Sequence, residues 1–309
     1  MKTLITLSTL LSLIWAFFLA VDAGAQGLPR PTFSVEGDIF ANSEFDKPSE
    51  TALRGNSSEV GTTAFQASAS YPIILKQGAD IYFIEASYKQ RQFDRHDWPV
   101  GVSLDPDRLH EINLSITYRT MFSQRWAAIF NLSPQLASDF SDNELHGDDF
   151  KLQGAFIMER MFSEHWTLGF GAAYATTFGK PFPLPLFTFR YESGGRWSAE
   201  GNLPASVEVN YRAASNLTTG FLVSAEGGQY HTPDLFPADM KIDNPQVQYI
   251  QVTGGPTLRL QPAANLALTL RGGLAYQGVR LYDGNDETPN SNYDLKPSAF
   301  ARAGLELSL

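Results

Sequence analysis

The feature that most constrains this chain is a strict two-residue alternation of apolar and polar side chains, which recurs in short segments along most of its length. In one segment Leu266, Leu268 and Leu270 alternate with Thr269 and Arg271. Because successive side chains of a β-strand point to opposite faces, this period predicts amphipathic strands.

Alternation fits either a water-soluble β-sandwich or a transmembrane β-barrel, and the connections between segments separate the two. Short connections near residues 76–79, 123–125, 163–165, 193–196, 213–216 and 261–265 alternate with polar links near 42–61, 92–108, 139–149, 179–183, 201–204, 232–244 and 283–294. Such asymmetry is typical of bacterial outer-membrane barrels, which have short periplasmic turns and longer extracellular loops.

The fold class that follows is all-β: a transmembrane antiparallel up-and-down β-barrel with an even number of strands, about 12 to 14, and both termini on the periplasmic side. The chain is also too long for a single sandwich. The weakest elements are the short segments 196–201 and 205–213, whose loss or merging would leave the lower number.

The N-terminus predicts export. Lys2 precedes an apolar stretch at 4–21, and Ala23-Gly24-Ala25 forms a small-residue cleavage site before Gln26. We therefore expect a signal peptide at 1–25 and a barrel domain at 26–309. An uncleaved anchor helix is the alternative, because the stretch is long enough to span a membrane. The chain contains no Cys, which excludes a lipid-anchored lipoprotein and disulfides.

Charged residues on the polar face of the strands are predicted to line the lumen. In contact with lipid, each Lys or Arg near the bilayer centre would cost about 2 to 4 kcal/mol. Two interpretations compete: a wet pore whose charges select solutes, or a mutually neutralising network that fills the interior. A barrel of this width favours the pore. The lumen-lining set is Glu85, Glu111, Arg119, Glu159, Arg190, Glu208, Arg259, Arg271 and Arg302, with Glu36, Asp38, Lys89, Lys151, Arg212, Glu226 and Glu306 on the same face.

A six-residue segment ending in Trp occurs twice. Residues 121–126 (MFSQRW) return as 161–166 (MFSEHW), and 193–197 (SGGRW) are similar to both. A shared binding motif is one interpretation. We favour a reused turn with Trp126, Trp166 and Trp197 as aromatic anchors at the periplasmic interface.

The C-terminal segment alternates Ala and Leu on one face with Phe300, Arg302, Glu306 and Ser308 on the other. A final strand with an apolar terminal residue resembles the signal that the barrel-assembly machinery recognises. The usual terminal residue is Phe, and this chain has Leu309.

Several short motifs resemble a known family. Leu184-Pro185, the turn before Trp197, Leu203-Pro204 and Tyr211-Arg212 are similar to the signature of an uncharacterised family, a domain of unknown function, of outer-membrane β-barrel proteins from Bacteroidetes-like bacteria. This resemblance implies the barrel fold and the outer membrane. It implies no activity.

Other chemistry finds little support. A net charge of -10 without a basic tract argues against nucleic acid. His96, His110, His146, His165 and His231 lie in loops, turns or strand edges with no convincing Ser or Asp dyad, so no enzyme is expected. Acidic loop residues such as Asp148, Asp149 and Asp283 match no calcium-loop spacing, and we expect neither a metal nor a cofactor.

We expect a passive channel or uptake protein for small solutes, embedded in outer-membrane lipid. The 92–108 loop, with Trp98 and Pro99, is the candidate constriction, and residues 26–32 are too few for a plug domain. The alternative is a non-conducting structural or surface-interaction barrel that uses its loops at 92–108 and 232–244. The sequence names no solute.

Overall fold

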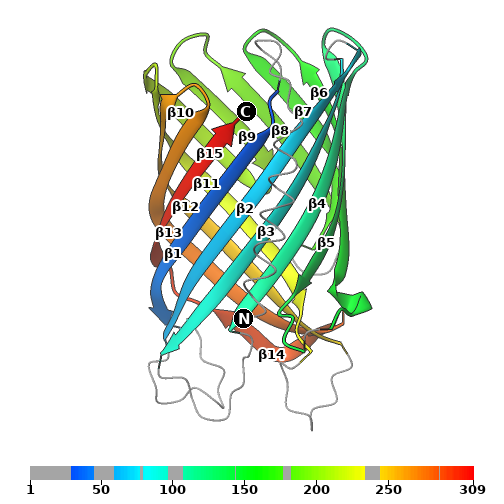
Figure 1. Ribbon diagram of the computed structural model, residues 1–309, viewed down its shortest axis with the longest axis vertical. Coiled ribbons are helices and arrows are strands. Elements are labelled where there is room, and N and C mark those ends of the chain that lie inside the picture. The colour runs from blue at the N-terminus through cyan, green and yellow to red at the C-terminus, as the bar shows by residue number, and fades with distance from the viewer. Residues whose placement is uncertain are drawn as a thin grey trace.

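The chain forms one closed antiparallel β-barrel (Figure 1). The computed structural model describes residues 29–44, 59–76, 79–96, 107–142, 144–176, 182–233, 244–284 and 286–309. Its strands are β1 (Thr32–Glu44), β2 (Glu59–Leu75), β3 (Asp80–His96), β4 (Arg108–Met121), β5 (Trp126–Ser138), β6 (Phe150–Met161), β7 (Trp166–Ala175), β8 (Phe182–Glu192), β9 (Trp197–Leu203), β10 (Ser206–Ala214), β11 (Leu217–His231), β12 (Pro245–Ala263), β13 (Leu266–Asp283), β14 (Asp286–Asp294) and β15 (Ser298–Ser308), with one short 3-10 helix, η2 (Gly147–Asp149).

Fourteen strand positions close the barrel over the described residues. Each strand from β1 to β13 pairs with the next, and β15 joins β13 to β1, where Thr32 faces Ser308. β14 pairs only with the far end of β13, beyond the part that β15 covers, so β14 and β15 share one position. The even count and the antiparallel topology confirm the fold class. The 283–294 segment, expected as a loop, is instead largely strand, because it continues the ladder along the long β13.

The two ends of the barrel differ. At one end, called here the turn end, tight connections join β2 to β3, β4 to β5 and their successors, and the C-terminus lies there (top of Figure 1). At the opposite end, called here the loop end, lie η2 and β14. Residues 1–25, and the proposed constriction at Trp98 and Pro99, lie outside the described residues.

Alternation along each strand separates a lipid-facing side from an inner side. On β13, Leu270 and Leu274 are 55% and 63% exposed, whereas Arg271 and Gln277 between and beyond them are buried. An outer surface of large apolar side chains suits hydrocarbon and would be unfavourable in water, so this is a transmembrane barrel. No helix among the described residues has the length and hydropathy to cross a membrane.

The wall is uneven in height. β2, β3, β11, β12 and β13 have 15 to 19 residues each. β6 to β10 have only 7 to 12. The barrel therefore has a tall side and a short side, and the difference shapes the lumen.

Candidate functional site: the barrel lumen

The repeated segments 121–126 and 161–166 form the same turn. In the first, the Trp126 carbonyl accepts hydrogen bonds from the backbone N–H groups of Phe122 and Ser123, and in the second the Trp166 carbonyl accepts them from Phe162 and Ser163. In the third segment, Ser193 Oγ accepts a hydrogen bond from the backbone N–H of Trp197. Trp126, Trp166 and Trp197 thus start β5, β7 and β9 at the turn end. Their position at a lipid interface stays a prediction.

An amphipathic cavity of about 480 Å³ lies inside the short side of the barrel. It brings together five of the residues predicted to line the lumen: Glu159, Arg190, Glu208, Arg271 and Arg302. Glu200 and Glu226 add acidic groups, and Ile129, Ile157 and Leu222 add apolar surface. The cavity could hold a small solute that has both polar and apolar parts.

A chain of ion pairs crosses the lumen beside this cavity. Lys89 Nζ on β3 lies 2.8 Å from one carboxylate oxygen of Glu226 on β11, and Arg302 on β15 donates to the other at 3.1 Å. Arg302 also donates two hydrogen bonds to the Asp38 carboxylate on β1, from Nε at 2.6 Å and from Nη2 at 2.7 Å. Since β3 and β11 stand on different sides of the barrel, Glu226 links opposite walls. We call Asp38, Lys89, Glu226 and Arg302 the charge tier.

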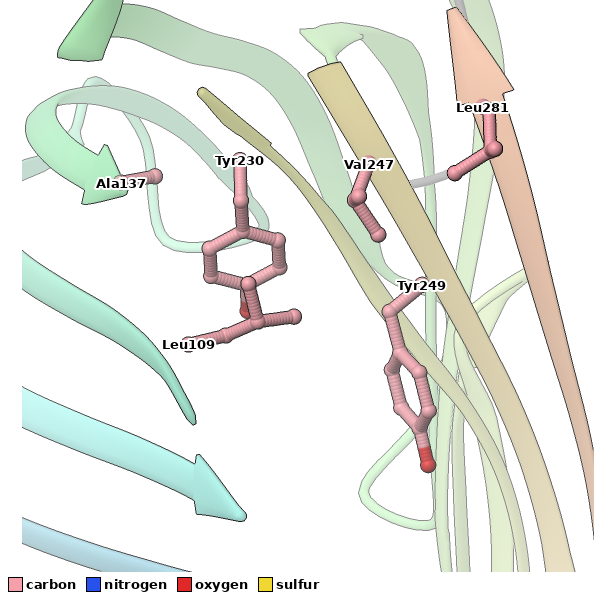
Figure 2. Packing of buried hydrophobic residues seen from close by; sticks show 6 residues of the cluster. All are labelled: Leu109, Ala137, Tyr230, Val247, Tyr249 and Leu281. Carbon is pink, nitrogen blue, oxygen red and sulfur yellow. The ribbon is translucent and has the colours of Figure 1, made fainter. Parts of the chain in front are cut away.

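Nearer the loop end the walls meet. The ends of the tall strands β11 and β12 pack on β4 and β5 through a buried cluster, called here the mouth cluster: Leu109, Ala137, Tyr230, Val247, Tyr249 and Leu281 (Figure 2). His231 at the end of β11 pairs with Ser138 at the end of β5, a strand to which it is not a neighbour in the barrel. The ends of β11 and β12 therefore meet β4 and β5 across the lumen and close its loop end.

Polar contacts reinforce this closure. The guanidinium of Arg91, fully buried on β3, lies 3.7 Å from the centre of the Tyr249 ring. Tyr230 donates a hydrogen bond to Glu111 at 3.2 Å. A buried cation over an aromatic face and a charge-assisted hydrogen bond both hold β3 and β4 against β11 and β12.

The other four residues predicted to line the lumen lie outside this cavity. Glu111 belongs to the mouth contacts, and Arg259 pairs with Glu306 at 2.8 Å near the turn end. Arg119 is the ladder partner of Ile129, which lines the cavity, and Glu85 is half-buried on β3 between Ser70 and Ser115.

Sequence reasoning did not single out Arg91, Tyr230 and Tyr249. Their alternation marks them as inward, but the pattern of one strand cannot tell that a strand from the opposite wall will cover them. One sequence signal was available on β12. Gln246 and Gln248 alternate with Val247 and Tyr249, so polar side chains occupy the face that would otherwise contact lipid, and in the structure both are buried.

Four histidine rings have hydrogen-bond partners among the described residues. His110, His146 and His231 bond to Tyr88, Asp142 and Asp149, and the His165 ring bonds to the Glu192 carbonyl. Over the described residues, no group of three or more His, Asp or Glu side chains is arranged to hold a metal ion.

Comparison with known proteins gives one family and several structural likenesses. A family described as "Domain of unknown function (DUF6268)" matches residues 21–308. No curated protein matches the chain. Among solved structures, an outer membrane channel from Pseudomonas putida F1 is 10% identical, with a TM-score of 0.44, and covers 94% of this chain and 100% of its own. A Pseudomonas aeruginosa FadL homologue is 10% identical, with a TM-score of 0.44, and covers 91% of each chain. The NanC porin is 7% identical, with a TM-score of 0.35, and covers 90% of this chain and 100% of its own.

Proposed function

The chain belongs to the DUF6268 family, a domain of unknown function, and we propose that it is a passive outer-membrane channel for the uptake of small solutes. The turn end would face the periplasm and the loop end the exterior, as the short turns and long connections of such barrels favour. The apolar outer wall supports membrane residence.

The observation that carries this proposal is the charged cavity inside a transmembrane wall. Glu159, Glu208, Arg190 and Arg271 surround a space of about 480 Å³, which is larger than a few water molecules need. A barrel kept only as a structural element gains nothing from unfilled space, since close packing stabilises a protein interior.

The closed mouth makes this a channel that must open. The mouth cluster lies on the loop-end side of the charge tier, so a solute on the axial route passes only when β11 and β12 move away from β4 and β5. These contacts are mostly side-chain packing and a single strand bridge, and a hinge movement of the strand ends would break them without breaking the barrel ladder.

Planar-bilayer conductance tests the proposal. Purified protein should give stepwise conductance, and Tyr230→Ala with Tyr249→Ala should raise the open probability or the step size, because the two largest mouth side chains are gone. Tyr174→Ala is the matched control, since Tyr174 is an exposed outer residue on β7, and it should behave as the wild type.

Silence of both the wild type and the mouth double variant would contradict the proposal, provided that both still migrate differently before and after boiling. The lumen would then be an internal neutralising network, and the non-conducting surface-interaction barrel would replace the channel. That alternative uses the loops at 92–108 and 232–244, of which residues 97–106 and 234–243 lie outside the described residues.

A further inference from the structure

The short side of the barrel has a gap at its loop end. The β9–β10 hairpin turns at Pro204 and Ala205, and β9 pairs with β8 only from Phe187 to Glu192. β8 continues past the hairpin through residues 182–186, and β11 continues past it through residues 225–231. Among the described residues no strand pairs with these two extensions on the hairpin side, apart from the His231–Ser138 bridge. We call the gap between these two extensions, on the loop-end side of the hairpin tip, the notch.

The notch reaches down into the membrane. The seven residues of β9 rise about 3.3 Å each, and at a tilt of about 40° they cover roughly 18 Å of height, against an apolar band about 25 Å tall. Residues 182–186 of β8 pair with β7 but have no strand on the hairpin side, and they add roughly 13 Å of height to this one-sided edge. The predicted position of Trp197 at one interface would place the hairpin tip inside the hydrocarbon layer.

The edge of β8 is adapted to being unpaired. Pro183 and Pro185 are ladder partners of Tyr174 and Ala172 on β7, and proline has no N–H to donate. Their nitrogens must therefore point away from β7, into the notch. Two donors are thereby removed from the open edge, a common way to keep an edge strand from pairing.

Water must reach the rest of the edge. Ala225 N–H is satisfied by the Ala205 carbonyl at the hairpin tip, and the next backbone groups on the same side of β11 are those of half-buried Gly227, whereas Gln229 beyond it is buried. Unpaired sheet edges occur at membrane depth only where they line an aqueous space. The cavity supplies that space, because its lining includes Gly201, Asn202 and Ser206 at the hairpin tip.

The notch is lined by small and apolar groups, unlike the charged lumen below it. Leu184 and Leu186 follow the inward alternation of Thr188 and Arg190, and Gly227 stands on the opposite side. On the outer rim, Phe189 covers Gly201, and Phe187 is exposed to lipid. A molecule dissolved in the outer leaflet would meet an apolar rim before it reached polar groups.

An interruption elsewhere in the wall, between β12 and β13, offers no such passage. The β12–β13 ladder is interrupted at Gly255–Pro256 and Gly272–Gly273. There the two backbones approach so closely that a Cβ on Gly255 would collide with the Gly272 carbonyl oxygen. Gly273 has a φ of +154°, and a Cβ there would collide with the Gly254 carbonyl. The two strand backbones are therefore in direct contact at this place, and no opening lies between them.

We propose that the notch is a lateral doorway through which small apolar or amphipathic molecules pass between the outer leaflet and the lumen. The inference rests on the proposed channel function and adds its solute class and route. With the mouth cluster closing the axis, the route leads from lipid over the hairpin tip into the cavity, where charged and polar groups receive the polar part of the molecule.

The test compares an apolar probe with ions. Cells of a porin-deficient Gram-negative host that express the protein are exposed to N-phenyl-1-naphthylamine, a neutral fluorophore that the outer leaflet retards, and single-channel conductance is recorded on the same variants. Leu184→Trp with Leu186→Trp fills the notch from the inside. Phe170→Trp adds bulk to the lipid-facing side of the neighbouring β7 and is the matched control.

We expect wild type and Phe170→Trp to increase probe uptake over vector cells, and the double Trp variant to lose that increase while keeping its conductance and its heat-dependent gel shift. Probe uptake that survives in the double variant would overturn the doorway. So would joint loss of uptake and conductance, which would place both on the axial route. A wild type that conducts ions without taking up the probe overturns the doorway alone, whereas a wild type that does neither overturns the channel as well.

Discussion

The ion pair between Lys89 and Glu226 should couple the two sides of the barrel energetically. The nitrogen and oxygen lie 2.8 Å apart, and their side chains are only 17% and 27% exposed. Coulomb's law at this distance gives about 1.5 kcal/mol in bulk water and about 6 kcal/mol at an effective dielectric constant of 20. Partial hydration places the expected coupling at about 2 to 4 kcal/mol.

A double-mutant cycle measures this coupling. Lys89→Gln, Glu226→Gln and the double variant are unfolded by denaturant in lipid vesicles, and the free energies of unfolding are compared. Glu226→Gln removes the carboxylate that pairs with Lys89, and Lys89→Gln leaves Glu226 with Arg302 as its remaining ion-pair partner, so the double variant should be less destabilised than the sum of the single changes.

The rim pair between Lys296 and Glu44 serves as the control. It has a similar length of 2.7 Å, but about half of each side chain is exposed, so it should couple far more weakly. Independent sites are additive to within about 0.5 kcal/mol. A Lys89–Glu226 coupling no larger than that would refute the trans-lumen link, and with it the charge tier as a structural tie.

Four further outcomes are expected. The folded barrel should migrate differently from boiled protein on a denaturing gel, because every paired strand must separate on unfolding; identical migration together with solubility in the absence of detergent would contradict the fold. Depth-dependent quenching should place Trp126, Trp166 and Trp197 near one interface, and a position at the bilayer centre would contradict the topology. Replacing four inward arginines by Gln should shift the reversal potential towards cation selectivity, and an unchanged potential would show that they do not line the conducting path; the four are Arg119, Arg190, Arg259 and Arg271. In the β5–β6 connection the Asp142 carboxylate, bonded to the His146 ring, raises the pKa of His146 above 6.5, so the stabilisation is complete at low pH and is lost as the pH rises through the raised value. NMR titration should show this pKa falling in Asp142→Asn, and an unaltered value would exclude the contact.

The architecture could be predicted because each strand carries its own signal. The alternation of Leu268 and Leu270 with Thr269 and Arg271 identifies a strand without knowledge of the strands that pair with it. The short hairpin of β9 and β10, the weakest of the expected elements, is present as two strands. The inner side of Glu159, Arg190 and Glu208 could be anticipated for the same reason. That these three share one cavity with Arg271 and Arg302 could not, because it depends on which strands stand opposite one another.

What the sequence determined by itself is therefore local: the period of the strands, the tight Ser-containing turns that lead into Trp126 and Trp197, and the inward parity of the charges. The tertiary structure decided how the wall heights combine. Tall β11 and β12 next to short β9 and β10 let Tyr230 and Tyr249 bend over the mouth, while the same mismatch leaves β8 and β11 without neighbours at the notch. Closure and opening thus come from one cause, the difference in length between consecutive strands of the wall. Its consequence depends on which strands the closed barrel places across the lumen from one another, such as β11 and β5, and the pattern of a single strand does not specify that.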